Sequence, residues 1–258
     1  MITRDCNVVD YSYISKELPK NTECFVLDSV TSTNDYLTAL PISDNIQLCV
    51  AREQTSGKGQ YDRTWLSKKD SSALFSLRIN FSSNVDLSGL SLVVGIALIE
   101  VLDCDYGVSN LKLKWPNDVY FTNKKLAGIL IENTVQNDSQ NVVIGVGVNN
   151  SIKGELGCET PWIDLYTIMN ITPNISTLTA RLANKVIKCC QQFEKKGLKQ
   201  FYSRWTELDY LVNKKVKLKY KGESLIGIAN GISEQGSLLV RDNENVIEVF
   251  SSEQIKLI

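Results

Sequence analysis

The chain has 258 residues, enough for one large domain or for a large and a small one. Hydrophobic residues make up 43% and charged residues 22%, which is typical of a globular protein and excludes a disordered, collagen-like or coiled-coil chain. The formal net charge is −1, so no overall basic field attracts nucleic acid. The chain contains no histidine, which excludes Ser-His-Asp and Cys-His catalytic sites and zinc sites that need imidazole.

The cysteines and the N-terminus bear on the cellular compartment. Seven cysteines, an odd number without C-x-x-C spacing, predict reduced thiols in a reducing compartment, with a hidden disulfide as the less favoured alternative. The first ten residues carry three charges and no apolar core, so we expect no signal peptide. The longest apolar stretch, residues 87–102, is too short and too interrupted to span a bilayer. We therefore expect a cytoplasmic protein without a membrane partner.

Hydrophobic periodicity predicts a mixture of strands and helices over the first 210 residues. A helix is expected over residues 87–102, with Asp86 as its N-cap. A hairpin turn is expected at residues 122–123, and two helices between residues 177 and 208 are expected to be broken near Gly197. Strands are expected at residues 24–28, 47–52, 74–81, 111–115, 119–121, 125–132 and 142–149.

The pattern changes after Asp209. Short segments of strand character follow, separated by Gly or Asn turns, and they predict a small β-barrel. We expect an α+β protein in which a mixed sheet with packed helices fills residues 1–210 and a small β domain fills residues 211–258. The lysine-rich run at residues 214–221 is interpreted as strand lysines on a solvated face, with nucleic-acid binding as the alternative.

Ser32, Thr33 and Asn34 form the first candidate site segment. Hydroxyl and amide side chains are the favoured N-caps of helices, so a capping role is the simpler interpretation. The same groups could hydrogen-bond a small polar ligand at the start of the helix. The sequence leaves both interpretations open.

The second candidate segment, residues 54–65, joins glycines to positive charge. Gly57 and Gly59 allow the backbone to approach an anion, while Lys58 and Arg63 supply cations. Residues 52–69 contain five cations and two anions. The segment fits neither the P-loop nor the Rossmann fingerprint, and a flexible solvated loop is the alternative.

Two further segments follow. Lys114-Trp-Pro-Asn-Asp118 places a lysine, an amide and a carboxylate together, which suits a phosphate chain with a divalent metal; an Asn-Asp turn is the alternative. Lys125 begins the next strand, and Gly128 is expected to leave room for a ligand over the sheet. In Gly-Val-Gly-Val-Asn, residues 145–149, two glycines share one face, so either a ligand or a tightly packed helix should approach there.

Taken in order, these segments resemble the biotin–protein ligase family from about Asp28 to the C-terminus. Lys-Trp-Pro-Asn-Asp-Val, followed at this distance by Lys-Leu-Ala-Gly-Ile-Leu, is the most specific part. The resemblance implies a catalytic domain related to class II aminoacyl-tRNA synthetases and an SH3-like C-terminal barrel. It also implies that biotin and MgATP give biotinyl-5′-AMP and pyrophosphate, after which biotin passes to a lysine of a biotin carboxyl carrier domain.

The resemblance implies roles for individual residues. Ser32, Thr33 and Gln54 would hold the ureido end of biotin, and Lys125 would contact the biotin carboxylate. The residues expected to be catalytic are Lys125, Lys114 and Asp118, with Asp118 also the expected ligand of Mg²⁺. The residues expected to bind biotin or ATP are Ser32, Thr33, Asn34, Gln54, Gly57, Lys58, Gly59, Gln60, Arg63, Trp65, Asn117, Gly128, Gly147 and Asn149, of which Trp65 and Asn149 would lie by the adenine nucleotide.

The loop departs from the family pattern. The usual sequence is Gly-Arg-Gly-Arg-Arg-Gly-Arg, whereas this chain has Gly-Lys-Gly-Gln-Tyr-Asp-Arg at residues 57–63. Lys58 keeps a charge without the planar fork of arginine, and Gln60 and Tyr61 replace cations. We therefore expect weaker retention of biotinyl-AMP than an arginine-rich loop would give.

Few residues precede the first motif strand, so we expect a ligase without a helix-turn-helix repressor domain and without a DNA partner. The sequence leaves the oligomeric state open, with a homodimer as one option. The nearest rival function is a lipoate–protein ligase, although its Arg-Arg-x-Ser-Gly-Gly-Gly signature is not found. A non-catalytic biotin- or nucleotide-binding protein is the rival from another class.

Overall fold

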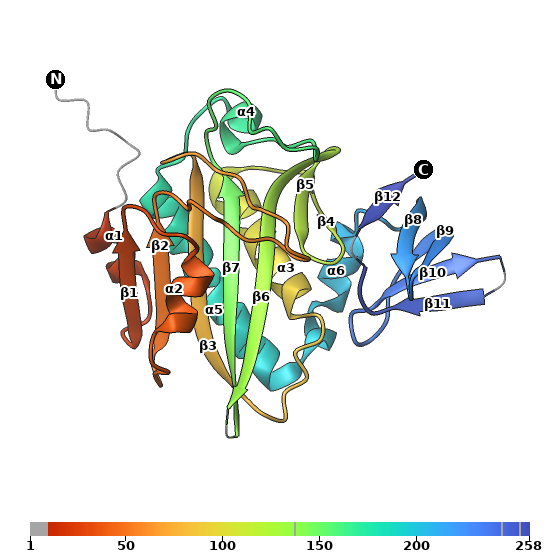
Figure 1. The fold of residues 1–258 in the computed structure, drawn as a ribbon, viewed down its shortest axis with the longest axis horizontal. Helices are drawn as coiled ribbons and strands as arrows, with labels where there is room; N and C mark the ends of the chain where they lie inside the picture. Colours follow the sequence, from red (N-terminus) through yellow and green to blue (C-terminus); the bar gives the residue numbers. More distant parts are fainter. Residues whose placement is uncertain (1–9, 137, 244, 253) are drawn as a thin grey trace.

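The computed structural model describes residues 10–258 except 137, 244 and 253, and it contains two sheets flanked by helices (Figure 1). The larger sheet has seven strands in the order β1-β2-β3-β7-β6-β5-β4. β1 and β2 are parallel and the other neighbours are antiparallel, so the sheet is mixed, as predicted. Its strands are β1 (Thr22–Leu27), β2 (Ile46–Ala51), β3 (Ser72–Ser82), β4 (Leu111–Lys114), β5 (Asp118–Phe121), β6 (Lys124–Gln136) and β7 (Ser139–Asn149).

Helices cover the two faces of this sheet unequally. The long helices α3 (Leu90–Tyr106) and α5 (Ile175–Lys196) pack together behind the sheet in Figure 1. The short helix α2 (Thr33–Ala39) lies on the opposite face, against β2, β3 and β7. The remaining helices are α1 (Tyr11–Glu17), α4 (Leu165–Met169), the 3-10 turn η1 (Leu198–Phe201) and α6 (Tyr202–Leu208).

The apolar residues divide in the same unequal way. One large buried cluster fills the α3 and α5 side of the sheet and includes Phe75 and Leu77 of β3. A second, small cluster lies beneath α2 and consists of Leu37, Cys49 and Val143, with a few partly buried neighbours. Because hydrophobic stabilisation scales with the apolar area buried, α2 receives much less of it than α3 or α5.

The prediction for the apolar helix was wrong at both ends. The helix α3 begins at Leu90, after Gly89 in a left-handed conformation, and Asp86 accepts a hydrogen bond from the backbone of Ser88 instead of capping the helix. It continues to Tyr106, where Gly107 forms a left-handed C-cap and donates to the carbonyl of Asp103. The extra C-terminal turn is mostly polar and exposed, so the end of the apolar run did not mark the end of the helix.

The predicted hairpin and helix break are confirmed. β5 and β6 pair Phe121 with Lys124, which leaves a two-residue turn at 122–123. Gly197 ends α5 with a φ of 65°, and its N–H donates to the carbonyl of Phe193. The turn η1 and the helix α6 follow and lead to the second sheet.

The second sheet is antiparallel, with strand order β11-β10-β9-β8-β12. It packs against the first part of the chain, where the indole Nε1 of Trp115 donates to the carbonyl of Gly236 at 2.9 Å. On β8, Lys215, Lys217 and Lys219 alternate with buried residues and are exposed, so the prediction of a solvated lysine face is confirmed. The strands are β8 (Lys215–Tyr220), β9 (Glu223–Ile232), β10 (Leu238–Asp242), β11 (Asn245–Val249) and β12 (Ile255–Leu257).

Two further findings concern the cysteines and the helices. Six cysteines lie within the described residues, and all six are free thiols. Cys6 lies outside the described residues. Over the described part of the chain, no helix combines the length and the apolar character that crossing a membrane requires.

Candidate active site

A cavity on the α2 side of the large sheet brings together residues from distant parts of the chain. Lys58, Asn117 and Lys125, which come from three separate segments, all line it. The predicted site residues in its lining are Ser32, Thr33, Asn34, Gln54, Lys58, Gly59, Gln60, Arg63, Trp65, Asn117, Asp118, Lys125, Gly128, Gly147 and Asn149.

Two predicted residues, Gly57 and Lys114, lie beside this lining. The carbonyl of Gly57 accepts from the N–H of Trp65 at 2.9 Å, and a Cβ at Gly57 would lie 2.7 Å from the carbonyl oxygen of Trp65. This glycine therefore serves the close approach of two backbone segments. Lys114 is the register partner of Asp118, and its pKa is lowered by burial and by the nearby Lys125, against the opposing effect of Asp118.

The capping interpretation of the Ser-Thr-Asn segment is confirmed, and the segment also lines the cavity. Ser32 is the N-cap of α2, and its hydroxyl oxygen accepts from the backbone N–H of Asp35 at 3.4 Å. The backbone N–H and the hydroxyl of Thr33 both donate to Oε1 of Gln54, at 2.8 and 3.0 Å. The cap therefore positions the side chains of Ser32 and Gln54 in the cavity wall.

Asn34 is fixed from two strands. Its Nδ2 donates to Oε2 of Glu132 on β6 at 2.6 Å, and its Oδ1 accepts from the hydroxyl of Ser76 on β3 at 2.6 Å. A Cβ at Gly145 would collide with this amide, so Gly145 is the site of close helix packing that the paired glycines had predicted as one alternative. The amide of Asn34 therefore ties α2 to the sheet.

The glycine-containing loop is a short β-hairpin over residues 57–65, closed by a β-bridge between its arms. Its tip is a turn over residues 60–63, with a backbone hydrogen bond of 3.3 Å. Tyr61 and Asp62, the central residues, have φ values of 55° and 57°. A turn with two positive φ values favours Asn-Gly, so Tyr and Asp hold this tip in a strained conformation.

The hairpin is tethered to α2 through Lys58. Its Nζ lies 2.5 Å from Oδ1 of Asp35, and this hydrogen bond raises the pKa of Lys58. The side chains are 47% and 43% exposed, and ion pairs this open to water contribute at most about 1 kcal/mol. The tether is therefore weak and sensitive to salt.

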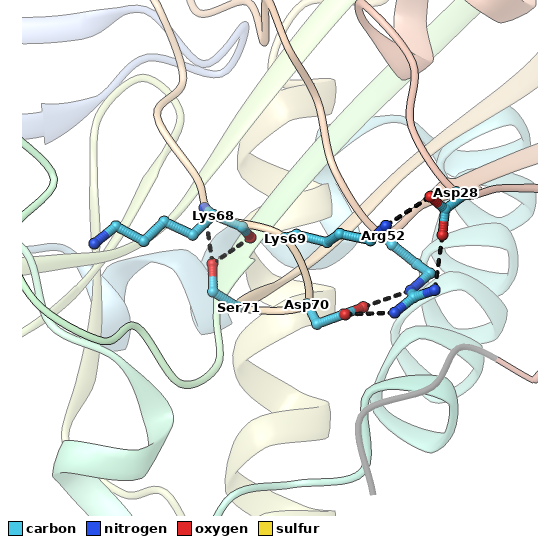
Figure 2. Close-up of polar contacts among 6 residues, drawn as sticks. All are labelled: Asp28, Arg52, Lys68, Lys69, Asp70 and Ser71. Atoms are coloured by element: carbon cyan, nitrogen blue, oxygen red, sulfur yellow. Dashed lines mark hydrogen bonds and ion pairs between the residues drawn. The ribbon is translucent and has the colours of Figure 1, made fainter. Parts of the chain in front are cut away.

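The base of the same loop is held more firmly by Arg52, as Figure 2 shows. The Arg52 guanidinium makes two hydrogen bonds to Asp70, at 2.7 and 2.6 Å, and a third to Asp28 at 2.7 Å. Lys69 donates to the other oxygen of Asp28 at 2.6 Å, and these cations lower the pKa of Asp28. Bidentate geometry within a network makes this cluster stronger than a single surface pair.

This cluster corrects the expectation that the local positive charge faces an anion. Arg52 and Lys69 are bound to carboxylates outside the cavity, and Nζ of Lys68 donates to the carbonyl of Lys153. Of the five cations between residues 52 and 69, Lys58 and Arg63 line the cavity.

The indole ring of Trp65 lies over Gly128 and Gly147. Gly128 on β6 is the register partner of Gly147 on β7, and a Cβ on either residue would lie within 3 Å of the indole ring. The indole therefore occupies the space over Gly128 where a ligand was expected. The ring Nε1 is buried without a hydrogen-bond partner among the described residues.

The catalytic candidates Lys125 and Asp118 form an ion pair of 2.6 Å in the cavity wall. The Lys125 ammonium also lies 5.4 Å from the centre of the Trp65 ring, within the range of a cation–π contact. Asn117 donates from Nδ2 to the carbonyl of Ile129 at 2.6 Å, which joins the Asn-Asp turn to β6. A cation, a carboxylate and an amide thus converge on one wall.

Asn149 ends β7 in the cavity wall. Its Nδ2 donates to the carbonyl of Ile163 at 3.0 Å, while its buried Oδ1 lacks a hydrogen-bond partner within the described part of the chain. The strand-like segment before Ile163 pairs with Lys125 through backbone hydrogen bonds of 2.9 and 3.0 Å. This pairing brings Trp162 into the lining, along with Leu156, Cys158 and Thr160.

Comparisons with known proteins agree with this geometry. The model of the biotin/lipoate A/B protein ligase family matches residues 26–149, and that of the biotin protein ligase C-terminal domain matches residues 211–252. The bifunctional ligase/repressor BirA of Escherichia coli is 34% identical over 237 residues, which cover 90% of this chain and 73% of BirA. The chain belongs to the biotin–protein ligase family.

Further relatives extend the match to this family. The biotin–[acetyl-CoA-carboxylase] ligase of Mycobacterium tuberculosis is 26% identical over 244 residues, covering 90% of this chain and 88% of that ligase. The biotin protein ligase of Aquifex aeolicus, solved with biotin and ATP, superposes with a TM-score of 0.80 at 27% identity, covering 92% of this chain and 98% of the other. The α+β fold with a second antiparallel sheet is therefore that of biotin–protein ligases.

The sequence interpretation missed Trp162 in the cavity lining, and it missed Ser76 and Glu132, which hold Asn34 in place. Ser76 gave a signal, because the alternation along β3 marks a polar face, but a polar strand face normally suggests solvent. Glu132 ended a recognised motif without being assigned a role. Trp162 lies outside the helices and strands, where periodicity gives no information.

Proposed function

We propose that this ligase uses the cavity to join biotin to ATP as biotinyl-5′-AMP and then transfers biotin to a lysine of a biotin carboxyl carrier domain. The observation that carries this proposal is the convergence of Lys58, Asn117 and Lys125 in the cavity that Ser32 and Gln54 also line. The lining combines the neutral side chains of Ser32 and Gln54 with the cations Lys58 and Lys125 and the amide of Asn117. This combination matches biotin, which has a neutral ureido ring and an anionic carboxylate.

The first step needs no histidine. The biotin carboxylate is already a nucleophile; its oxygen bonds to the α-phosphorus while the bond to the β-phosphate oxygen breaks and pyrophosphate leaves. The barrier arises from bringing two anions together, so fixed cations and amides should stabilise the transition state. We assign Lys125 to the biotin carboxylate and the bridging oxygen, and Lys114, Asn117 and Asp118 to the phosphate end.

The hydrogen bonds around α2 suggest how the ureido group binds. The Ser32 oxygen accepts from Asp35, which leaves its hydroxyl hydrogen for the ureido carbonyl. Oε1 of Gln54 accepts both donors of Thr33, which turns Nε2 toward the ligand side. In this proposal Ser32 and Gln54 contact biotin, while Thr33 and Asn34 hold them in place.

The nucleotide end is assigned to the hairpin and to the ends of the sheet. Trp65 and Asn149 each present a buried polar atom without a partner among the described residues, and adenine or ribose could satisfy both atoms. The hairpin glycine Gly59, with Lys58, Gln60 and Arg63, would close over the adenylate. Because the mixed anhydride reacts with water, this closure should shield it until the acceptor lysine arrives.

Mg²⁺ fits the phosphate end. Asp118 presents a partly exposed carboxylate beside the amide of Asn117, and Mg²⁺ in nucleotide sites is typically held by one or two carboxylates together with substrate phosphates. Among the described residues no cluster of three acidic or thiol ligands exists, so the phosphates would supply further ligands. When bound, Mg²⁺ supplies charge neutralisation at the phosphates.

In the second step the neutral amine of the acceptor lysine attacks the acyl carbon and AMP leaves. Asp118 could orient that amine. We propose that residues 1–210 form the catalytic unit and that residues 211–258 form a small domain packed against it. A homodimer, the option that the sequence left open, is tested by the molecular mass of the protein in solution.

Mass spectrometry tests the function directly. The protein is incubated with MgATP, a carrier domain, and either biotin or lipoate. We expect the carrier to gain one biotinyl group, and a lysine-to-arginine carrier should stay unmodified. Modification by lipoate instead would identify a lipoate ligase, and biotin binding without a mass change would identify a binding protein.

A further inference from the structure

Three polar side chains of β3 point toward the short helix α2. Ser76, Arg78 and Asn80 are two residues apart and therefore share one face of the strand. Ser76 bonds to Thr33 and Asn34 at the start of α2, and Asn80 donates to the carbonyl of Ser43 at 2.8 Å, beyond the end of the helix. Arg78 lies between them and contacts the end of α2 itself.

Arg78 is a buried cation that binds backbone carbonyls at the end of α2. The residue is only 4% exposed, and its Nη1 donates to the carbonyls of Leu37 at 2.7 Å and Leu40 at 3.0 Å. Nη2 donates to the carbonyl of Pro41. Leu37 lies in the last turn of α2, where helix carbonyls carry partial negative charge, and Leu40 and Pro41 follow the helix, so the buried guanidinium gives all three carbonyls a charged donor.

The helix depends on such contacts because it is short and lies on little apolar surface. It has seven residues, too few for independent stability, and its Leu37 forms a small buried cluster with Cys49 and Val143 of the sheet. A shift of α2 along its axis would move Ser32 and the Gln54 contact in the cavity wall. The polar contacts of β3 therefore set the position of the biotin-binding groups.

We propose that Arg78 is a positioning residue for biotin, acting by fixing the C-terminal end of α2 so that Ser32 and Gln54 keep their places in the cavity. This inference rests on the proposed function, because it concerns the same site. Arg78 lies outside the cavity lining and touches neither reacting group, so its effect should fall on biotin affinity and not on the nucleotide.

The experiment compares Arg78→Met, Arg78→Lys and Ile79→Ala in the full chain. Ile79 is the next residue of β3, points to the opposite face and belongs to the main core, so Ile79→Ala is the control for general destabilisation. For each variant we would measure the Kd of biotin by calorimetry, the KM of ATP at saturating biotin, and Tm.

We expect Arg78→Met to raise the biotin Kd by about tenfold, because it removes the hydrogen bonds that hold the end of α2 and a tenfold change corresponds to about one hydrogen bond. The KM of ATP should stay nearly unchanged. Arg78→Lys keeps the charge but lacks the fork that serves several carbonyls, so we expect a rise of about threefold. Ile79→Ala should lower Tm and leave the biotin Kd unchanged.

Wild-type biotin affinity in Arg78→Met would overturn the inference, and so would an equal rise in the Ile79→Ala control. If Arg78→Met does not fold, Arg78→Lys decides, because an unchanged biotin Kd in that variant contradicts the inference. Failure of the wild type to bind biotin would instead refute the proposed function, so the two failures are distinguishable.

Discussion

The helix α2 and the hairpin at residues 57–65 each form part of the wall of one cavity, yet they are held very differently. The helix is bonded at its start to Gln54 and Ser76 and at its end to buried Arg78. The hairpin carries two residues of positive φ at its tip and is tethered to α2 by an exposed ion pair. One wall is therefore preorganised, whereas the other can open.

This difference matches the demands of the two steps. A preorganised wall loses little conformational entropy when the vitamin binds, so affinity for biotin should reside in α2. A wall that opens can admit ATP and later the acceptor lysine, and can exclude water between those events. Elements that move in this way come from the low-stability part of a fold.

The largest effect is expected at Lys125 on β6, whose ammonium lies beside Trp65 of the hairpin. Lys125→Met removes the cation assigned to the biotin carboxylate and should lower the rate of biotinyl-AMP formation by about 10² to 10³-fold, the usual cost of losing one electrostatic stabiliser. Pyrophosphate release measures this rate. Lys124→Met, the control at an exposed position next to it, should retain wild-type activity.

A pair of glycine substitutions compares the walls directly. In Gly145→Ala the new methyl group meets Asn34, which two hydrogen bonds hold in place, so the free energy of unfolding should fall by about 2 kcal/mol and biotin should bind more weakly. In Gly147→Ala it meets Trp65 on the hairpin, which can shift, so the loss should be about 1 kcal/mol or less. Urea denaturation measures the free energy of unfolding of both variants. Equal losses of this free energy would show that α2 and the hairpin do not differ in rigidity.

The positive charge of the hairpin should control how long biotinyl-AMP stays bound to the protein. Gln60→Arg restores a cation that the family pattern has at this position, so release of free biotinyl-AMP should slow by about threefold to fivefold, as expected for one partly exposed charge contact. Rapid filtration with labelled biotin measures this release. Equal release from the variant and the wild type would show that charge at position 60 has no influence.

The smallest effect is expected at the tether between the walls. Asp35→Asn weakens the bond to Lys58 and should speed release of biotinyl-AMP by about twofold, because exposed pairs contribute little. Raising the salt concentration should speed release from the wild type and have less effect on the variant. Asp44→Asn, which alters another exposed acid near α2, serves as the control.

The sequence predicted the parts of the molecule that local patterns determine. Alternation identified β3 and β4, and the glycines at residues 145 and 147 correctly indicated close approach to the sheet. The family resemblance implied that Lys58, Asn117 and Lys125 share one site, and these residues, far apart in the chain, line one cavity.

What the sequence could not predict depends on partners that only the fold brings together. Arg52 and Lys69 form ion pairs with Asp28 and Asp70. A count of charges along the loop cannot show this pairing. Trp65 covers Gly128 only because the hairpin folds back over the sheet. Arg78 lies on the polar face of an alternating strand, and only the fold shows that the end of α2 covers this face.

Hydrogen exchange of the unliganded protein tests the contrast between the two walls most directly. Peptides that cover residues 32–41 should be protected, and peptides that cover residues 57–65 should exchange rapidly. Adding biotin and MgATP should protect residues 57–65 strongly and change residues 32–41 little. Equally fast exchange of both segments without ligand, or a hairpin already protected, would contradict the account.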